Sequence, residues 1–87
     1  MRLGQKEKLL TSVKNNPKDR EYRELVSLLT KYGFVVVDSQ GKGSHCPVYH
    51  SIYKDLRWTL SRHKPMKTFH AKKVVSLIEE VIMREEN

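Results

Sequence analysis

Two stretches near the start of the chain carry apolar residues every three or four positions, which is the period of a helix with one buried face. The first stretch covers residues 5–14, and the Asn-Asn-Pro sequence that follows it is typical of a helix end. The second stretch runs from Asp19, a suitable N-cap, to Gly33, a suitable C-terminal cap. Its apolar stripe consists of Tyr22, Leu25, Val26, Leu28, Leu29 and Tyr32. We therefore expect two helices before the first strand.

Three short stretches then predict strands. Residues 34–37 form an unbroken apolar run of mostly β-branched side chains, short enough for a buried strand. Residues 44–50 and 56–62 alternate between the two faces of a strand. The alternation directs Cys46, Val48, Leu56, Trp58 and Leu60 inward, and His45, Pro47, Tyr49, Arg57, Thr59 and Ser61 outward. We expect a sheet with one apolar face and one wet, basic face.

Pro47 conflicts with this pattern. The second strand of a meander is central, and a proline there removes a hydrogen-bond donor from the ladder. We therefore expect either a ladder that is broken beside His45 or a bulge that aims the His45 side chain.

The last stretch predicts a further helix, which begins near Thr68. Its apolar stripe consists of Ala71, Val74, Val75, Ile78 and Ile82. Three consecutive strands with short connections favour an antiparallel meander, whose apolar face the flanking helices can cover. The predicted fold is a single α+β domain over residues 1–87, a two-layer sandwich with a three-stranded antiparallel sheet covered on one face by helices.

Length and composition limit the possible functions. A chain of 87 residues buries only about 60% of its surface, so a deep, elaborate pocket is not expected. The single cysteine, Cys46, cannot form an internal disulfide or complete a multi-cysteine zinc site. No apolar run approaches the roughly 18 residues of a membrane span, and the first ten residues lack the apolar core of a secretion signal. We expect a cytoplasmic protein that does not enter a membrane.

Charge is distributed unevenly along the chain. The formal net charge is +7, and the whole excess lies in residues 39–73. That segment holds eight Lys and Arg residues, one acid and all four histidines. Such a block attracts polyanions by neutralising phosphates and releasing counterions. It is also compatible with a basic surface that only keeps the protein in solution.

From Asn16 onward the chain resembles the HicA toxins, the mRNA interferases of HicA/HicB toxin–antitoxin pairs. The segment REYRELVSLLTKYGFVVV is similar to the family's helix that ends in Gly-Phe and a strand, and GKGSH to its Lys-Gly-Ser-His. WTLSRHKPMK is similar to its Thr-hydrophobic-Pro-Val-His-Lys segment, and KKVVSLIEEV to its closing helix. The chain departs from the family pattern at Cys46 and Pro47, where many members have a second histidine and an aromatic or aliphatic residue, and at Ser61, where a proline is usual.

The resemblance implies a double-stranded-RNA-binding-domain (dsRBD)-like fold for residues 16–87, preceded by an N-terminal helical extension at 1–15. It implies a catalytic histidine at the Gly-Ser-His position, which is His45 here. It also implies cleavage of mRNA without a metal or another cofactor, and neutralisation by a HicB antitoxin.

Imidazole is suited to RNA cleavage independently of any family. The reaction needs a base for the 2′-OH proton, an acid for the leaving 5′-oxygen, and cations beside the crowded phosphorane. The ordinary histidine pKa of about 6.5 lies close to cellular pH. His45 is therefore the catalytic candidate, with His63 and Lys42 as possible auxiliary residues. Gly41 and Gly43 would let backbone N–H groups approach a phosphate.

The basic residues near these histidines are the candidates for RNA binding. They are Lys42, Arg57, Arg62, Lys64, Lys67, Lys72 and Lys73. His50 and His70 are interpreted as structural, and Trp58 as part of the core. No metal site is predicted, because the histidines lack a His-Glu-x-x-His pairing and carboxylate neighbours.

Three interpretations remain open. The first is a ribonuclease toxin that uses His45 on the exposed sheet face. The second is a non-catalytic double-stranded-RNA-binding module of the same fold, which would hold duplex RNA through Lys72, Lys73 and the basic loops. The third is an interaction protein whose basic face binds an acidic partner. A histidine at position 45 favours the first, since a passive binder needs lysine or arginine there.

Overall fold

The computed structural model describes residues 4–37 and 43–86. They form helices and strands in the predicted order. The elements are α1 (Gln5–Asn15), α2 (Tyr22–Lys31), β1 (Phe34–Val36), β2 (His45–His50), β3 (Arg57–Ser61) and α3 (Thr68–Glu86). The strands pair antiparallel in the order β1-β2-β3. The predicted α+β fold with a three-stranded antiparallel sheet is therefore confirmed.

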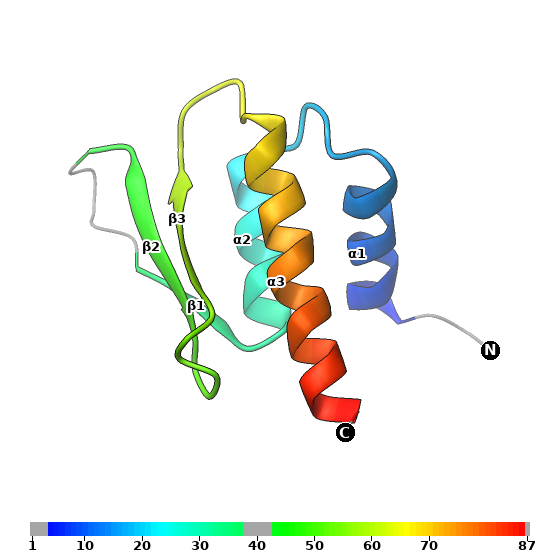
Figure 1. The fold of residues 1–87 in the computed structure, drawn as a ribbon. Coiled ribbons are helices and arrows are strands. Elements are labelled where there is room, and N and C mark those ends of the chain that lie inside the picture. The colour runs from blue at the N-terminus through cyan, green and yellow to red at the C-terminus, as the bar shows by residue number, and fades with distance from the viewer. Residues whose placement is uncertain (1–3, 38–42, 87) are drawn as a thin grey trace.

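The helices lie on one side of the sheet. Figure 1 shows α2 and α3 next to the sheet and α1 beyond them. α1 packs against α2 and α3 rather than against the strands. The core joins all these elements through fully buried side chains such as Val13 of α1, Leu25 of α2, Leu60 of β3 and Ile78 of α3. The sandwich thus carries α1 as an additional outer layer.

The start of α2 differs from the sequence prediction. The N-cap is Glu21 rather than Asp19. Glu21 and Glu24 form a reciprocal capping box, in which the Glu21 backbone N–H donates to the Glu24 carboxylate at 3.0 Å. Asp19 instead lies in the preceding turn with φ of 56°, a backbone conformation that Asp tolerates better than most residues. The prediction of Asp19 as the cap is wrong because the helix begins two residues later.

His50 fastens the end of α2 to the β2–β3 hairpin. The side chain is 2% exposed, and its Nδ1 accepts hydrogen bonds from the N–H groups of Ile52 (3.0 Å) and Tyr53 (3.1 Å). Nε2 therefore carries the proton and donates to the Tyr32 carbonyl at 2.9 Å. Gly33 makes this approach possible, since its φ is +89° and a Cβ there would lie 2.8 Å from His50 Nε2. The structural role predicted for His50 is confirmed.

Pro47 lies inside β2 without a bulge. The β2–β3 register is continuous, with Pro47 opposite Thr59, so the disruption expected beside His45 does not occur on this side. Hydrogen-bonded and non-hydrogen-bonded positions alternate along an antiparallel pair, and Pro47 occupies a non-hydrogen-bonded position toward β3. Its nitrogen therefore faces β1, where the Val37 N–H donates to the Pro47 carbonyl (2.8 Å). Because β1 ends at Val36, the N–H that Pro47 lacks would lie at the end of the β1–β2 ladder.

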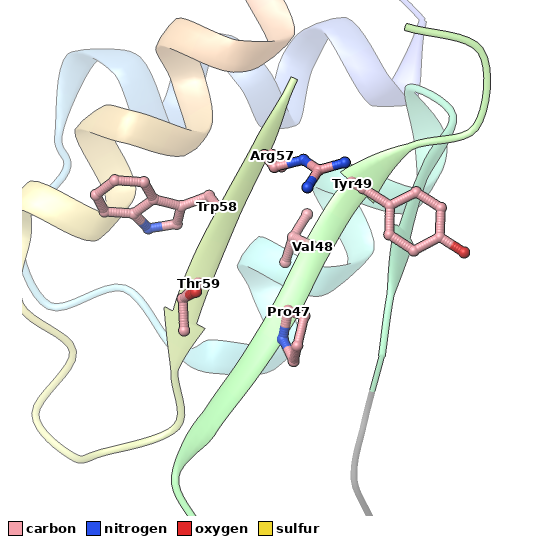
Figure 2. Close-up of a pocket in the computed structure, with 6 residues that line it drawn as sticks. All are labelled: Pro47, Val48, Tyr49, Arg57, Trp58 and Thr59. Carbon is pink, nitrogen blue, oxygen red and sulfur yellow. The ribbon is translucent and has the colours of Figure 1, made fainter. Parts of the chain in front are cut away.

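The uncovered face of the sheet is less basic than the alternation predicts. Val35 and Val37 lie on this face and are 38% and 42% exposed. Beside them β2 and β3 form an open hollow (Figure 2). Its lining includes Pro47, Tyr49, Arg57 and Thr59. Among the described strand residues of this face, Arg57 carries the only permanent positive charge. The expectation of a wet, basic face is therefore wrong, because the other described basic residues of the segment 39–73 lie outside the strands.

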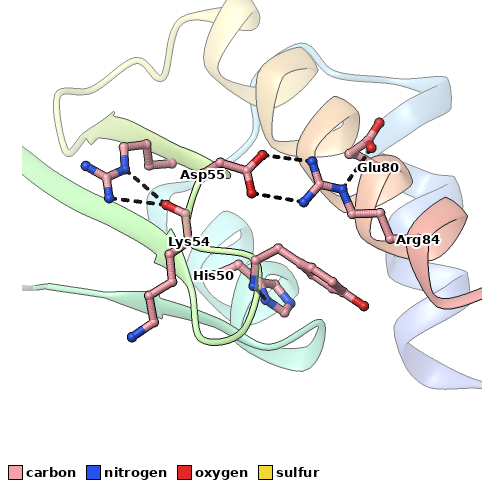
Figure 3. A network of polar contacts seen from close by, with 7 residues as sticks. His50, Lys54, Asp55, Glu80 and Arg84 are labelled. Atoms are coloured by element: carbon pink, nitrogen blue, oxygen red, sulfur yellow. Dashed lines mark hydrogen bonds and ion pairs between the residues drawn. The ribbon is translucent and has the colours of Figure 1, made fainter.

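A polar network joins the β2–β3 turn to the last turns of α3 (Figure 3). Arg84 donates through both terminal nitrogens to the Asp55 carboxylate, at 2.9 and 2.8 Å, and through Nε to Glu80 at 3.0 Å. The hydrogen bonds from Arg84 lower the pKa of Asp55. A carboxyl group whose pKa is lowered on folding stabilises the fold above its ordinary pKa and loses this contribution as pH falls through the lowered value. The network is therefore intact at neutral pH.

We expect His50→Ala to lower the free energy of unfolding by about 2–4 kcal/mol, because it leaves two partly buried N–H groups and one buried carbonyl without partners. His50→Asn keeps an acceptor near the position of Nδ1 and should recover part of this loss. Urea denaturation of the three proteins measures both effects. A loss below about 1 kcal/mol for His50→Ala would contradict the structural role of the ring.

Candidate functional site

His45 is the first residue of β2, and its side chain is exposed. The alternation expected along this strand is confirmed, because Cys46 and Val48 are buried while His45 and Pro47 are exposed. Across the sheet His45 pairs with Ser61, the last residue of β3. The imidazole therefore lies at the end of the sheet from which the chain crosses to α3.

Arg62 holds the segment that leads into His45. The Arg62 backbone N–H donates to the Ser44 carbonyl, and its Nη2 donates to the Gly43 carbonyl, both at 2.7 Å. Gly43 has φ of +75°, a conformation that favours glycine. Arg62 is one of the candidate RNA-binding residues, but in the structure its guanidinium bonds the backbone beside His45. It thereby helps to position the start of β2.

Ser61 lies on the same face as His45 but is only 9% exposed, so the predicted outward exposure is wrong. The connection between β3 and α3 folds back over it, and the His63 N–H donates to Ser61 Oγ at 3.1 Å. This turn directs the residues after β3 toward His45.

An open hollow lies between the start of β2, the β3–α3 connection and the first turn of α3. Its volume of about 730 Å³ falls within the range of small-ligand sites. Three imidazoles and three ammonium groups are among its lining. They belong to His45, His63, His70, Lys18, Lys64 and Lys67. Asp19 contributes a carboxylate to the same lining. Most of the ionisable side chains around the hollow are therefore basic.

The structure brings four of the predicted site residues to this hollow. His45 and His63, the candidates for the two proton transfers, both line it, together with Lys64 and Lys67. They come from β2 and from the β3–α3 connection. The antiparallel pairing makes these segments neighbours although they are distant in sequence.

The other predicted site residues lie elsewhere. Arg57 is on the uncovered sheet face, where its guanidinium donates to a carbonyl of the β2–β3 turn at 3.2 Å. Lys72 borders a small hollow on the side of α3 that faces α1. Lys73 Nζ lies 5.2 Å from the centre of the Trp58 ring, in a cation–π arrangement. Lys42 lies outside the described residues.

His70 is a residue of the hollow that the sequence pattern did not identify. It is 7% exposed, and its Nδ1 accepts a hydrogen bond from the indole Nε1–H of Trp58 at 3.0 Å. Trp58, predicted as core, is half-buried and packs against the core. A partly buried tryptophan needs an acceptor for its indole N–H. The presence of Trp58 in the sequence could therefore have indicated a nearby acceptor such as His70.

The contact with Trp58 fixes the tautomer of His70. Because Nδ1 accepts, the proton of the uncharged ring lies on Nε2. Burial lowers the pKa of His70, and the positive charges of His45 and Lys67 lower it further. Nε2 has no hydrogen-bond partner among the described residues. It is not fully enclosed either, because among those residues Tyr32 Oη is the only fully enclosed side-chain nitrogen or oxygen atom without a partner. Nε2 is therefore accessible from the hollow.

Within residues 4–37 and 43–86, no group of three or more His, Cys, Asp or Glu side chains is arranged to hold a metal ion. No helix in the same ranges is long and apolar enough to cross a membrane.

No protein-family model matches the chain, and searches of curated proteins and of solved structures found no significant match. The resemblance to HicA toxins therefore rests on the sequence motifs alone. Function has to be argued from the site itself.

We expect His70 to titrate below the ordinary histidine pKa of about 6.5, and Trp58→Phe to raise its pKa. The substitution keeps an aromatic ring but removes the N–H that occupies Nδ1, so Nδ1 can then take a proton. The imidazole signals of His70, followed by NMR as a function of pH, measure the change. An unchanged pKa in Trp58→Phe would contradict the role given to this hydrogen bond.

Proposed function

We propose that this protein is an endoribonuclease, an mRNA interferase that acts as the toxin of a type II toxin–antitoxin pair in the cytoplasm. The observation that carries the proposal is the exposed imidazole of His45 at the basic hollow. The resemblance to HicA toxins supports it, since it assigns the catalytic role to the same residue. The substrate is mRNA.

The charge of the hollow supports an RNA substrate. Lys18, Lys64 and Lys67 border it, and lysines in such an arrangement bind a phosphate backbone by releasing its counterions. The hollow is open, so a polymer can lie across it instead of entering end first. A ribose-phosphate segment can therefore reach His45 from solvent.

In the proposed reaction, His45 accepts the 2′-OH proton and the 2′-oxygen attacks the adjacent phosphorus. The bond from phosphorus to the 5′-oxygen breaks, which leaves a 2′,3′-cyclic phosphate and a 5′-hydroxyl. His63 donates the proton that the leaving 5′-oxygen needs. Lys64 and Lys67 stabilise the negative charge of the phosphorane. Each proton transfer contributes roughly 10²–10⁴-fold, and the scheme uses neither a metal nor another cofactor.

The proposed protein partner is a HicB-like antitoxin. The resemblance supports this assignment, and the lysines around the hollow are complementary to an acidic segment. An antitoxin that covered His45 would block substrate access without altering the fold.

We expect His45→Ala to lower kcat/KM for RNA cleavage by at least about 100-fold, since it removes one proton transfer. Inducible expression in a bacterium should arrest growth for the wild type and not for His45→Ala. Lys31→Ala is a control, because this exposed lysine at the end of α2 removes one charge away from the hollow. Equal toxicity of wild type and His45→Ala would remove His45 from the mechanism. A wild type that binds RNA without cutting it would favour the non-catalytic double-stranded-RNA-binding module.

The two groups of candidate lysines should differ in their effect on RNA binding. Lys67→Ala removes a charge at the hollow, and we expect the slope of log K against log salt to decrease by about 0.7 if this lysine contacts one phosphate of a single strand. Lys72→Ala removes a charge on the α1 side of α3, and the slope should not change. Both are measured in the His45→Ala background, where the RNA stays intact. An equal decrease for the two variants would place the RNA along α3 instead.

A further inference from the structure

Phe69 and His70 form an aromatic pair in the first turn of α3. Their ring centres are 4.3 Å apart and the ring planes are inclined by 29°, so the two rings are stacked. Both residues line the hollow, but His70 is buried whereas Phe69 is 53% exposed. His70 is held by its bond to Trp58, whereas half of the Phe69 surface is open to water at the hollow.

His70 can donate a hydrogen bond into the hollow but is poorly suited to transferring protons. To act as a base, the ring would have to take a proton at Nδ1, which already accepts the Trp58 N–H. To act as an acid, an uncharged imidazole would have to give up its only N–H proton, which is far less acidic than that of an imidazolium. The His70 ring therefore keeps one available group, the Nε2–H, which can donate a hydrogen bond from a fixed position to an anionic oxygen.

We propose that Phe69 and His70 form a subsite for one unpaired nucleotide of an RNA strand. Phe69 stacks on the base, and His70 Nε2–H donates to an oxygen of a neighbouring phosphate. The identification of the ligand as RNA rests on the proposed function, whereas the exposed ring and the fixed donor are features of the structure. Lys64 and Lys67 line the same hollow as His45, Phe69 and His70, so a strand that reaches both the subsite and His45 lies beside positive charge.

The subsite selects single-stranded RNA over duplex RNA. A base can stack on a side chain only if one of its faces is free, and within a duplex both faces are covered by neighbouring base pairs. A module that binds duplex RNA reads backbone shape across the minor groove and needs no exposed aromatic side chain at its site. Phe69 therefore separates the nuclease that we propose from the double-stranded-RNA-binding alternative.

The test uses His45→Ala protein, which should leave RNA intact, and fluorescence anisotropy with a short labelled single strand and with the duplex of the same sequence. Phe69→Ala should weaken single-strand binding by about 5- to 140-fold, the range of base–aromatic stacking, and leave duplex binding unchanged. Phe69→Leu keeps an apolar side chain without a ring and should show a comparable loss. Phe69→Tyr keeps the ring and should bind as the parent does.

Two substitutions of His70 separate its donor role from its role as partner of Trp58. His70→Gln can place an amide N–H near the position of Nε2, whereas His70→Asn can place an amide oxygen near Nδ1 and offers no donor toward the hollow. We expect Gln to preserve single-strand binding and Asn to weaken it about tenfold or more, the effect of losing a hydrogen bond to a charged oxygen. If Asn binds as the parent does and Gln binds poorly, His70 serves only to hold Trp58.

The outcomes separate this subsite from the proposed nuclease activity. If His45→Ala abolishes cleavage but Phe69→Ala binds the single strand normally, the subsite is wrong and the nuclease proposal stands. If the wild type does not cleave RNA but Phe69→Ala weakens single-strand binding, the subsite stands without catalysis. Equal losses for single strand and duplex overturn the assignment to an unpaired nucleotide, and a parent protein that binds no RNA overturns both proposals.

Discussion

The unbroken pairing of β2 with β3 is the constraint on which the rest of the structure depends. It places His45 opposite Ser61 at one end of the sheet. The β3–α3 connection begins at the same end and turns back over Ser61. The register is fixed by burial, because a slip of one residue would turn Cys46 and Val48 out into water and bring His45 into the core. Pro47 does not disturb this pairing, since its missing N–H faces the end of β1.

The contacts that fasten the hairpin to the helices lie toward both ends of the sheet. At the end away from His45, His50 bonds Tyr32, the C-cap of α2, and the β2–β3 turn, and Arg84 joins Asp55 to α3. At the His45 end, Tyr22 Oη donates to Cys46 Sγ at 3.2 Å, and the Arg62 guanidinium donates to the backbone that precedes β2. His45 and His63 are exposed, so these two side chains can be replaced without removing the buried contacts of the fold.

Local periodicity predicted the elements and the orientation of His45, because both depend on which face of a strand or helix is buried. It did not predict where the charge would gather. Alternation tells which way Arg57 points, but not that the segment after Ser61 folds back and carries His63 and Lys64 to the β2 end. His70 was missed for a similar reason, since its environment comes from a tryptophan twelve residues earlier in the chain and not from its helical neighbours.

The four histidines differ in which of their ring nitrogens already make hydrogen bonds. This difference says more about the role of each histidine than the residue type does. Both nitrogens of His50 bond backbone groups, so it has no capacity left for a substrate. His70 keeps one free donor and no free acceptor. The ring nitrogens of His45 and His63 make no hydrogen bond with any residue that the structure describes, and both side chains are exposed at the hollow. Among the four histidines, these two keep both ring nitrogens available at the hollow, which is why the proposed base and acid are assigned to them.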